Sequence, residues 1–401
     1  MLAVIETHPI QYHAPVYRAL QTRCGVPVRA IYGSDFSVAG YTDREFGASF
    51  AWDTDLLSGY GSTFLSRVAE GGATSAEAVS PAGLRSALEA LRPAAVLIVG
   101  YSPQFHRVAW REAWRAGYPV LFRGETSDEA QPRNWLKSGA RRAALGLAYR
   151  TCERLLYIGA RSRAHFERLG VKSERLVFSP YCVDVTSFDA DEAARTRLRP
   201  DARRELGVDD GHVVLLYAGK LSHRKGVDLI MRSVRVLPPA TRQRVVVVFL
   251  GEGDRRAELV AQADEEPQVR ARFLGFQNQT CLSRYYHAAD LLVLPSRRSE
   301  TWGLVVNEAL HHGLPCVVSD QVGCVPDLIE DGVTGAVFQT ESTVGLAAAI
   351  ESTRSLSGDL RIREACRQTV ARYSVDGAAQ GIRSAYAAVV ANGRARTERV
   401  G

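Results

Sequence analysis

A short cationic loop framed by two glycines is the first feature whose residue types suit ligand binding. Residues 219–226 read Gly-Lys-Leu-Ser-His-Arg-Lys-Gly and stand between an apolar run and an amphipathic segment. Lys220 and Lys225 are two of only four lysines in the chain, and Arg224 adds a third cation. Cations beside the start of a helix suit an anionic ligand such as a diphosphate. The alternative is a solvated turn with a capping glycine, and the GxxxxGK[ST] phosphate loop is absent from the sequence.

Two glutamates eight residues apart form the second feature. Glu300 and Glu308 flank Gly303 in a segment that follows another apolar run. Eight residues advance a helix by about two turns, so both carboxylates could face one cavity. Carboxylates accept hydrogen bonds from hydroxyls, which suits a polyol ligand, and Gly303 would let backbone amides approach a phosphate closely. The alternative is an exposed glutamate followed by an ordinary helical one.

Length and composition limit the class of protein in which this chemistry can operate. The chain has 401 residues, of which 46% are hydrophobic and 23% charged, with a net charge of +6. These values are typical of a globular protein rather than a disordered one. Seven cysteines without a CxxC pair fit a reducing compartment better than a disulfide framework or a zinc site. No signal-peptide pattern and no apolar run of about 18 residues is present, so we expect a cytoplasmic protein, at most peripheral on the inner membrane face.

Apolar runs that alternate with amphipathic segments must position these residues. In the first half, strands are expected at 2–6, 28–32, 94–99, 120–122 and 155–158, with helices at 14–24, 81–91, 105–117 and 162–169. In the second half, strands are expected at 213–218, 245–250, 272–276, 291–294 and 316–319, with helices at 227–237, 255–263, 280–289 and 304–312. The pattern predicts an α/β protein with two Rossmann-like, doubly wound parallel sheets facing across a cleft. Ligands of such sheets bind at the carboxyl ends of the strands.

The same pattern divides the chain into four parts. Residues 1–185 form the first domain and residues 211–374 the second. Residues 186–210, rich in Asp, Ala and Arg, form a linker with a first helix. Residues 375–401 form a C-terminal helix that we expect to return to the first domain.

Taken together, these segments resemble the donor domain of glycosyltransferase family 4, which contains retaining enzymes of the GT-B fold. The matching residues, in order, are Ala218-Gly219, Lys225-Gly226, Leu250-Gly251-Glu252-Gly253, Phe273-Leu274-Gly275, Tyr286, Ala289-Asp290, Pro295-Ser296, Glu300, Gly303-Leu304, Glu308-Ala309, Gly313-Leu314-Pro315, Ser319-Asp320, Gly323, Asp331-Gly332 and Gly335. A further run, Pro180, Val183-Asp184 and Phe188, is similar to the segment that closes the family's first domain.

The resemblance implies roles for individual residues. Glu300 would contact hydroxyls of the donor sugar, and Glu308 would contact the nucleotide ribose. Lys225 and Lys220 would hold the diphosphate, although the family usually has arginine in place of Lys220, whose ammonium lacks the bidentate fork. The remaining donor-binding residues would be Gly219, Arg224, Phe276 near the base, Trp302 where the family usually has Phe or Tyr, Gly303, Leu304 and Val305.

The implied reaction moves a sugar from a nucleotide sugar to an acceptor hydroxyl with retention of configuration. A UDP-sugar is the first expectation and a GDP-sugar the next, and the acceptor would be a glycan, a lipid-linked molecule or a small molecule. Lys225, Lys220, Glu300 and His106 would act at the reacting centre by positioning and charge stabilisation. No cofactor is expected besides the nucleotide-sugar co-substrate, and no metal. Residues 53–55 spell the DxD of metal-dependent glycosyltransferases of another fold, which we interpret as coincidence.

Acceptor binding would fall to the first domain, where the resemblance is thin. Family members often carry a histidine near His106, close to the reacting sugar; a histidine on a helix surface is the alternative. Arg123 and Glu125 follow a predicted strand and either point into the cleft or form a buried structural pair. His8 and His13 bracket a loop that we interpret as acceptor-facing rather than metal-binding. The full set of expected acceptor-binding residues is His8, Gln11, Tyr12, Tyr101, Arg123 and Glu125.

Several alternatives remain open at this stage. Residues 135–150 mix aromatic and basic side chains, which would suit either an anionic membrane surface or a solvated helix packed on the sheet. A GT-B-fold UDP-sugar epimerase and a non-catalytic nucleotide-sugar-binding partner protein are the competing functions. A nucleic-acid partner is suggested only by the pI of about 9.0 and is not expected, because no RRM, KH or helix-turn-helix signature appears.

Overall fold

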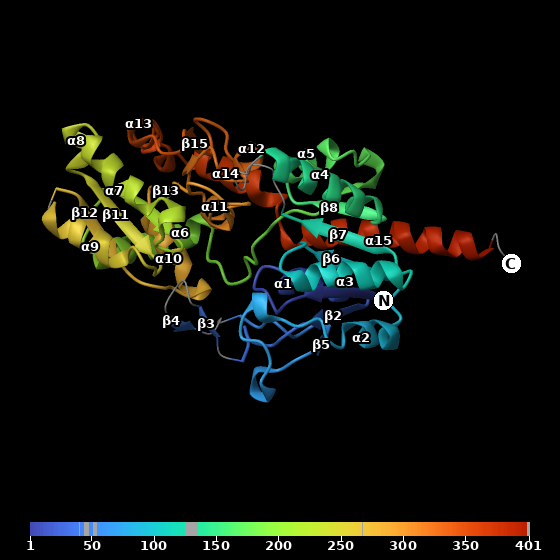
Figure 1. Cartoon of the computed structure of the whole chain (residues 1–401). Helices are drawn as coiled ribbons and strands as arrows, with labels where there is room; N and C mark the ends of the chain where they lie inside the picture. Colours follow the sequence, from blue (N-terminus) through green and yellow to red (C-terminus); the bar gives the residue numbers. More distant parts are fainter. Residues whose placement is uncertain (40, 44–47, 51–53, 126–134, 267, 399–401) are drawn as a thin grey trace.

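The computed structural model describes residues 1–39, 41–43, 48–50, 54–125, 135–266 and 268–398. It contains two large parallel sheets in separate α/β domains that lie side by side (Figure 1). The fold class predicted from the sequence is thereby confirmed.

The first domain is built on a seven-stranded parallel sheet with the order β5-β2-β1-β6-β7-β8-β9. Its strands are β1 (Leu2–Glu6), β2 (Val28–Tyr32), β5 (Gly61–Phe64), β6 (Ala95–Val99), β7 (Val120–Gly124), β8 (Arg154–Tyr157) and β9 (Leu176–Phe178). Its helices are α1 (Ala14–Thr22), α2 (Leu84–Leu91), α3 (Gln104–Arg115), α4 (Trp135–Arg150) and α5 (Ala160–Arg168). A separate antiparallel pair joins β3 (Tyr41–Asp43) and β4 (Ala48–Phe50).

The second domain is built on a six-stranded parallel sheet with the order β12-β11-β10-β13-β14-β15. Its strands are β10 (Val213–Ala218), β11 (Val245–Leu250), β12 (Arg270–Phe273), β13 (Leu291–Leu294), β14 (Cys316–Ser319) and β15 (Gly335–Phe338). The helices of this half are α6 (Glu192–Leu206), α7 (Val227–Val236), α8 (Pro239–Arg242), α9 (Arg256–Glu265), α10 (Leu282–Ala288), α11 (Leu304–His311), α12 (Val325–Leu328), α13 (Thr343–Thr353), α14 (Leu360–Ala371) and α15 (Val375–Glu398).

Alternate residues of the strands build separate cores on the two faces of the first sheet. Leu2 and Val4 belong to one cluster, while Ala3 and Ile5 belong to the other, as the two-residue period of a strand requires. Because both faces are covered, the central strands are mostly apolar, and this pattern makes them recognisable in the sequence.

Helix α6 attaches the segment between the two sheets to the second domain. Its Arg199 and Arg203 donate to the carboxylate of Asp290 at 2.7 and 3.2 Å, respectively. Arg203 also donates to the carbonyl of Ala288 at the end of α10, at 2.8 Å. Since Arg203 is almost fully buried, the contacts to Asp290 fix this helix on the sheet that follows it.

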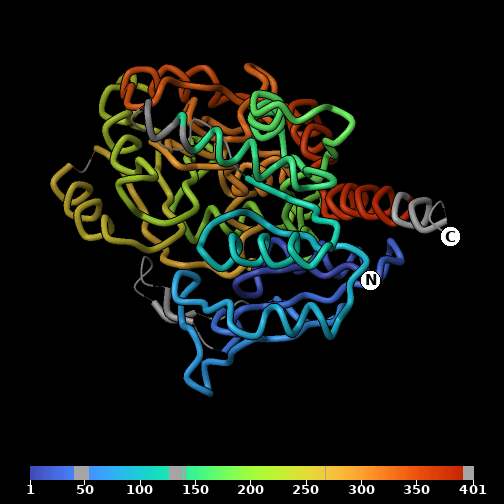
Figure 2. The backbone as a smooth tube through the Cα atoms, turned by 45° about the vertical axis from the view of Figure 1, so that its right-hand side comes forward, coloured from blue at the N-terminus to red at the C-terminus, as the bar shows by residue number. Residues whose placement is uncertain are grey.

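Helix α15 leaves the second domain and completes the core of the first. Figure 2 shows it as a red helix that runs from the upper, second-domain part of the molecule along the first domain. Ile382 and Ala385 are buried in the same cluster as Leu2 and Val4. At Gly381 the helix approaches β9 so closely that an added Cβ would lie 2.1 Å from the carbonyl oxygen of Phe178.

Replacing Gly381 by Leu should therefore loosen α15 from the first domain. Overpacking of a tight contact typically costs about 1–3 kcal/mol, so thermal unfolding should begin at a clearly lower temperature. Ser384→Leu on the exposed side of the same helix is the matched control and should cost less than about 0.5 kcal/mol. Equal effects of the two substitutions would contradict the close approach of α15 to β9.

Candidate functional site

Two cavities lie at the carboxyl ends of central strands, and both take residues from both domains. The larger has a volume of about 510 Å³ and is lined by segments that follow β1, β6 and β7, together with Ser299 and Thr301 of the second domain. The smaller, of about 140 Å³, is lined by segments that follow β10 and β11, together with Gln11 and Tyr12 of the first domain. This is the edge at which ligands of parallel α/β sheets bind.

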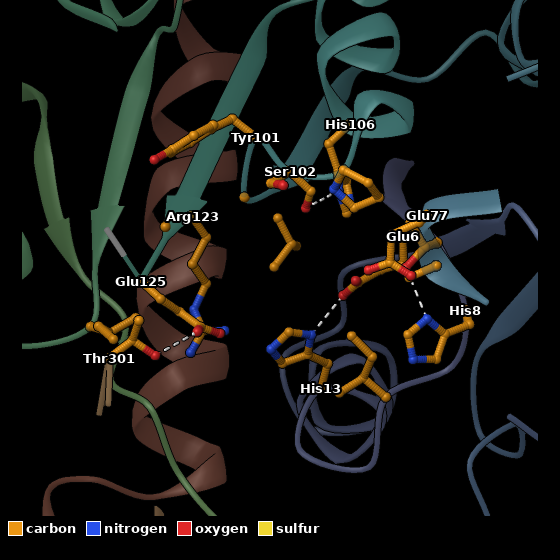
Figure 3. Close-up of a pocket in the computed structure, with 18 of the residues that line it drawn as sticks. Glu6, His8, His13, Glu77, Tyr101, Ser102, His106, Arg123, Glu125 and Thr301 are labelled. Carbon is orange, nitrogen blue, oxygen red and sulfur yellow. Dashed lines mark hydrogen bonds and ion pairs between the residues drawn. The ribbon is translucent and has the colours of Figure 1, made fainter. Parts of the chain in front are cut away.

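A buried glutamate–histidine pair lines the larger cavity (Figure 3). Glu6, the last residue of β1, is 1% exposed, and its Oε1 accepts hydrogen bonds from His13 Nδ1 at 2.7 Å and from the Tyr17 hydroxyl at 2.5 Å. Burial alone would raise the pKa of Glu6, but the charge and hydrogen bond of His13 bring it below its usual value. Glu6 is therefore a carboxylate that orients the His13 ring at the start of α1.

The expected catalytic histidine, His106, lies in the same cavity. It is 4% exposed at the start of α3, and its Nδ1 donates to the carbonyl oxygen of Ser102 at 2.9 Å. Burial lowers the pKa of His106, which favours the neutral imidazole. Because a carbonyl oxygen only accepts, the proton of the neutral ring is on Nδ1 and Nε2 carries a lone pair.

Arg123 and Glu125 line the larger cavity with separate partners. Arg123 donates to the carbonyl oxygens of Ser179 and Pro180, at 3.4 and 2.7 Å. The carboxylate of Glu125 instead accepts a hydrogen bond from the Thr301 hydroxyl of the second domain at 3.1 Å. Glu125 is thus one of the contacts between the domains, and Arg123 holds the segment after β9.

His8 and Tyr101 also line the larger cavity, as we expected for acceptor-side residues. The His8 ring lies 4.3 Å from that of Phe36, and burial lowers the pKa of His8 to about 4. The Tyr101 hydroxyl accepts a hydrogen bond from Arg141 of α4. Gln11 and Tyr12, by contrast, lie at the smaller cavity beside predicted donor-side residues.

The two segments singled out in the second half of the sequence meet through an ion pair. Lys225, in the turn before α7, binds the carboxylate of Glu300, which also accepts from the Ser296 hydroxyl at 2.8 Å. Burial raises the pKa of Glu300, but Lys225 outweighs it, so the pKa lies below its usual value. Arg224 donates to the Ser299 carbonyl at 3.3 Å, and Lys220 accepts through its carbonyl from the Tyr217 hydroxyl at 2.7 Å.

A second ion pair locks the same two segments together. Arg297 binds both carboxylate oxygens of Asp228 on α7, at 2.6 and 2.9 Å, and donates to the His223 carbonyl at 2.9 Å. Such a bidentate contact fixes geometry as well as charge. The sequence did not single out Arg297 or Asp228, because neither residue type nor spacing shows that they pair.

Glu308 lines the smaller cavity, with Gly219, Phe276 and Val305 around it. It is 5% exposed, and its carboxyl group accepts from the Tyr286 hydroxyl at 2.6 Å. Burial, only partly offset by this bond, raises the pKa of Glu308 to about 7. The pKa values of Glu308 and Glu300 are thus shifted in opposite directions although the two residues belong to one motif.

Three expected donor-binding residues, Trp302, Gly303 and Leu304, lie at the start of α11. Gly303 has φ of 97°, and an added Cβ would lie 2.9 Å from Val322, so the position requires glycine. The Trp302 side chain, 2% exposed, lies 5.4 Å from the Tyr373 ring and donates to Asn307 at 2.8 Å. It lines neither cavity. Leu304 packs against the core of the second domain.

The remaining sequence features have local structural roles where the structure describes them. Asp53 lies outside the described residues, and Asp55 accepts from the backbone amides of Leu57 and Ser58 at 2.9 and 3.1 Å. The basic segment 135–150 forms α4, whose Leu145 and Tyr149 are buried against the first sheet. In the described part of the chain, no helix has the length and apolar character needed to cross a membrane, and no group of three metal-ligating side chains comes together.

Comparison with known proteins agrees with the architecture of the second half. Residues 199–369 match the family described as glycosyl transferases group 1. The second half of the chain is thus similar to the group 1 glycosyltransferases. D-inositol 3-phosphate glycosyltransferase of Mycobacterium sp. (strain KMS) is 37% identical to this chain over 180 residues, which is 44% of this chain and 40% of the relative. An uncharacterized glycosyltransferase of Methanocaldococcus jannaschii is 30% identical over 183 residues, 44% and 45% of the two chains. The match thus spans less than half the length of these curated relatives.

Solved glycosyltransferase structures share the fold over nearly the whole chain. HepE of Anabaena, solved in complex with UDP and glucose, has a TM-score of 0.68 at 18% identity and covers 96% of this chain and 99% of its own. WaaG, a glycosyltransferase involved in lipopolysaccharide biosynthesis, has a TM-score of 0.67 at 17% identity, covering 96% and 98%. Sucrose-phosphate synthase of Thermosynechococcus elongatus has a TM-score of 0.69 at 16% identity, covering 98% and 99%. The predicted GT-B arrangement is confirmed.

The site also contains residues that the sequence reasoning missed. The sequence places Glu6 in the first strand and His13 at the end of an acceptor-facing loop, and neither is among the expected acceptor-binding residues. A usable signal existed, because Glu6 is the one charged residue of an otherwise apolar strand. A charge at the carboxyl end of a buried strand indicates a site.

Replacing Glu308 by Gln should alter how stability depends on pH. The folded-state pKa of about 7 lies above the ordinary 4.5. Protonated Glu308 therefore makes its full contribution to the free energy of unfolding below about pH 4.5, and this contribution is lost as the pH rises through 7. Chemical denaturation should therefore find Glu308→Gln more stable than the wild type at pH 8, by up to about 3 kcal/mol. The two should converge near pH 4. The exposed Glu70→Gln is the control and should show no such divergence; a parallel pH profile for Glu308→Gln would mean that Glu308 is charged at neutral pH.

Proposed function

We propose that the chain is a retaining glycosyltransferase that moves a sugar from a nucleotide sugar, with UDP-sugar first and GDP-sugar next, to an acceptor hydroxyl. The observation that carries the proposal is the Lys225–Glu300 ion pair. It joins a cationic loop and a carboxylate at the ligand-binding edge of a group 1 glycosyltransferase domain. The relatives' names and the UDP and glucose in HepE support the same reaction class.

The cationic loop would receive the diphosphate of the donor. Lys220, Arg224 and Lys225 supply positive charge just after β10 and before α7, and Lys225 is already oriented by Glu300. As the bond to the sugar breaks, charge develops on the diphosphate, and fixed cations stabilise it without reorganisation. This is the role that a divalent ion has in other glycosyltransferases, and we propose that transfer here needs no added metal.

The two motif glutamates would bind hydroxyls in different ways. Glu300, kept charged, accepts hydrogen bonds from hydroxyls of the donor sugar once it shares Lys225 with the ligand. Glu308, with a pKa near neutrality, can both donate to and accept from the ribose. Phe276 and Val305 line the same cavity as Glu308, which suits the nucleoside end of the donor.

The first domain would bind the acceptor and position its reacting hydroxyl. His106 lies in the larger cavity with a neutral ring, where it can position the acceptor hydroxyl against the sugar. The hydroxyl proton passes to the leaving diphosphate on the face from which it departs, so configuration is retained. The acceptor is a glycan, lipid-linked molecule or small molecule, and we propose a cytoplasmic enzyme of polysaccharide biosynthesis, with α4 as the surface nearest a membrane-bound acceptor.

A thermal-shift screen of UDP-, GDP- and ADP-sugars tests the donor directly. A donor present at about 100 times its dissociation constant should add about 2.7 kcal/mol of stability. Binding should be followed by acceptor-dependent release of the nucleoside diphosphate, with the product's anomeric configuration read by NMR. Conversion of the bound sugar without any acceptor would instead indicate the epimerase, and binding without turnover the partner protein.

Lys225→Met should lower turnover by about 10²–10³-fold, because it removes a charge that stabilises the departing diphosphate. Since Glu300 would then be buried without its cation, the double variant Lys225→Met/Glu300→Gln is the control for folding. It should restore stability relative to the single variant but not activity. A turnover near that of the wild type in Lys225→Met would remove this residue from the mechanism.

A further inference from the structure

The larger cavity contains two buried imidazoles that share one unusual feature. His13 and His106 both line it, and each is 4% exposed. Each ring has Nδ1 bound to a protein oxygen, His13 to Glu6 at 2.7 Å and His106 to Ser102 at 2.9 Å. In each ring the other nitrogen, Nε2, is buried without a hydrogen-bond partner among the described residues.

An unpartnered buried nitrogen raises the free energy of the folded protein. A buried polar atom that loses water without gaining a partner costs about 1–3 kcal/mol, and such atoms in folded proteins call for an explanation. Two of them in one cavity, on rings that come from different segments, indicate a ligand that supplies the missing partners. Figure 3 shows His13 with one nitrogen toward Glu6 and the other directed away from it, toward the side occupied by Arg123 and Glu125.

The partners of Nδ1 in the two rings limit the hydrogen-bonding role of each Nε2. Ser102 contributes a carbonyl oxygen and Glu6 a carboxylate whose pKa is lowered by His13 against the effect of burial. Both oxygens accept, so Nδ1 carries a proton in each ring. In the His106 ring, whose pKa is lowered by burial, Nε2 is then a hydrogen-bond acceptor, whereas Nε2 of His13, beside the Glu6 carboxylate, accepts as an imidazole and donates as an imidazolium. The fitting ligand group is therefore a hydroxyl, which can donate to one ring and accept from the other.

The charges around the cavity argue against an anionic ligand. Glu6, Glu77 and Glu125 line it, and they would repel a phosphate. Its two arginines already have partners, since Arg123 donates to the Ser179 and Pro180 carbonyls and stacks on the Tyr181 ring. Arg141 donates to the Tyr101 hydroxyl and lies over its ring.

We propose that the acceptor is an uncharged polyhydroxylated molecule, and that His13, held by Glu6, forms a hydrogen bond through Nε2 with one of its hydroxyls in the cavity shared with His106. The inference rests on the proposed glycosyl transfer and names its acceptor class. His13 is an acceptor-binding residue, and Glu6 is a positioning residue that acts through it. The Tyr17 hydroxyl also donates to Glu6 and so helps to fix the position of its carboxylate.

The acceptor class is tested with the full chain and a saturating donor from the thermal-shift screen. Methyl glucoside, methyl galactoside and myo-inositol are the uncharged probes, and glucose 6-phosphate and myo-inositol 1-phosphate are the charged ones. We expect at least one uncharged probe to have a kcat/KM about tenfold or more above both phosphates. Preference for a phosphate, or transfer to no uncharged probe while the donor binds, overturns the proposal.

The role of His13 is tested by His13→Phe, which keeps a ring but removes both nitrogens. Loss of one hydrogen bond should raise the KM for the preferred uncharged probe about tenfold, with the donor dissociation constant unchanged within about twofold. His165→Phe is the matched control, because His165 is equally buried in the same domain but does not line the cavity; it should leave both constants unchanged. An unchanged acceptor KM in His13→Phe overturns the role, as does an equal loss of donor and acceptor affinity.

Glu6→Gln covers the case in which His13→Phe does not fold. The amide oxygen can keep both hydrogen bonds of Glu6 while the charge that orients His13 is lost. We expect acceptor kcat/KM to fall several-fold with donor affinity intact, and an unaltered value contradicts the positioning role. The proposed function fails if no nucleotide sugar binds the wild type, or if a bound donor is transferred to none of the probes, charged or uncharged. Transfer that prefers a phosphate over every uncharged probe overturns only this inference.

Discussion

Both faces of the two parallel sheets are buried, and this burial determines where polar side chains can lie in the molecule. The interior of such a strand accepts mainly apolar side chains, because a polar group there loses its hydration and needs a protein partner, as Arg123 of β7 has in the Ser179 and Pro180 carbonyls. Polar groups therefore appear where the strands end: Glu6 closes β1, Lys220 follows β10 and Ser296 follows β13. Since all strands of a parallel sheet end at one edge, residues that are distant in sequence meet there.

In the second domain, two ion pairs hold the loops at this edge in fixed positions relative to each other. Lys225 binds Glu300, and Arg297 binds Asp228 in a bidentate contact, so the turn before α7 and the loop after β13 are held in one relation. Buried ion pairs contribute little net stability once desolvation is counted, but breaking one is costly. Their effect here is to hold cations and carboxylates in place before a ligand arrives, which is the condition for electrostatic stabilisation.

The sequence revealed the interior of the sheets better than their edges. Six strands, including β1, β10 and β13, match the prediction residue for residue because they are apolar on both faces. In the two large parallel sheets, the strands that were missed, β5, β9 and β15, are all edge strands, which are short and only partly buried. At the site, spacing and the family resemblance singled out Lys225 and Glu300 separately, but not the ion pair between them. The direction of the Trp302 side chain, toward Tyr373, likewise depends on packing between distant segments.

The loop between β1 and α1 reaches both cavities and contacts both domains. Its first-domain anchor is the bond between Glu6 and His13, beside the larger cavity. Its second-domain anchor is the 2.7 Å hydrogen bond from Gln11 to Gln279, and both glutamines line the smaller cavity. A displacement of one domain against the other would therefore break the Gln11 contact at the smaller cavity and the Thr301–Glu125 contact at the larger one. The Glu6–His13 pair, whose two members both belong to the first domain, would move intact with its own sheet.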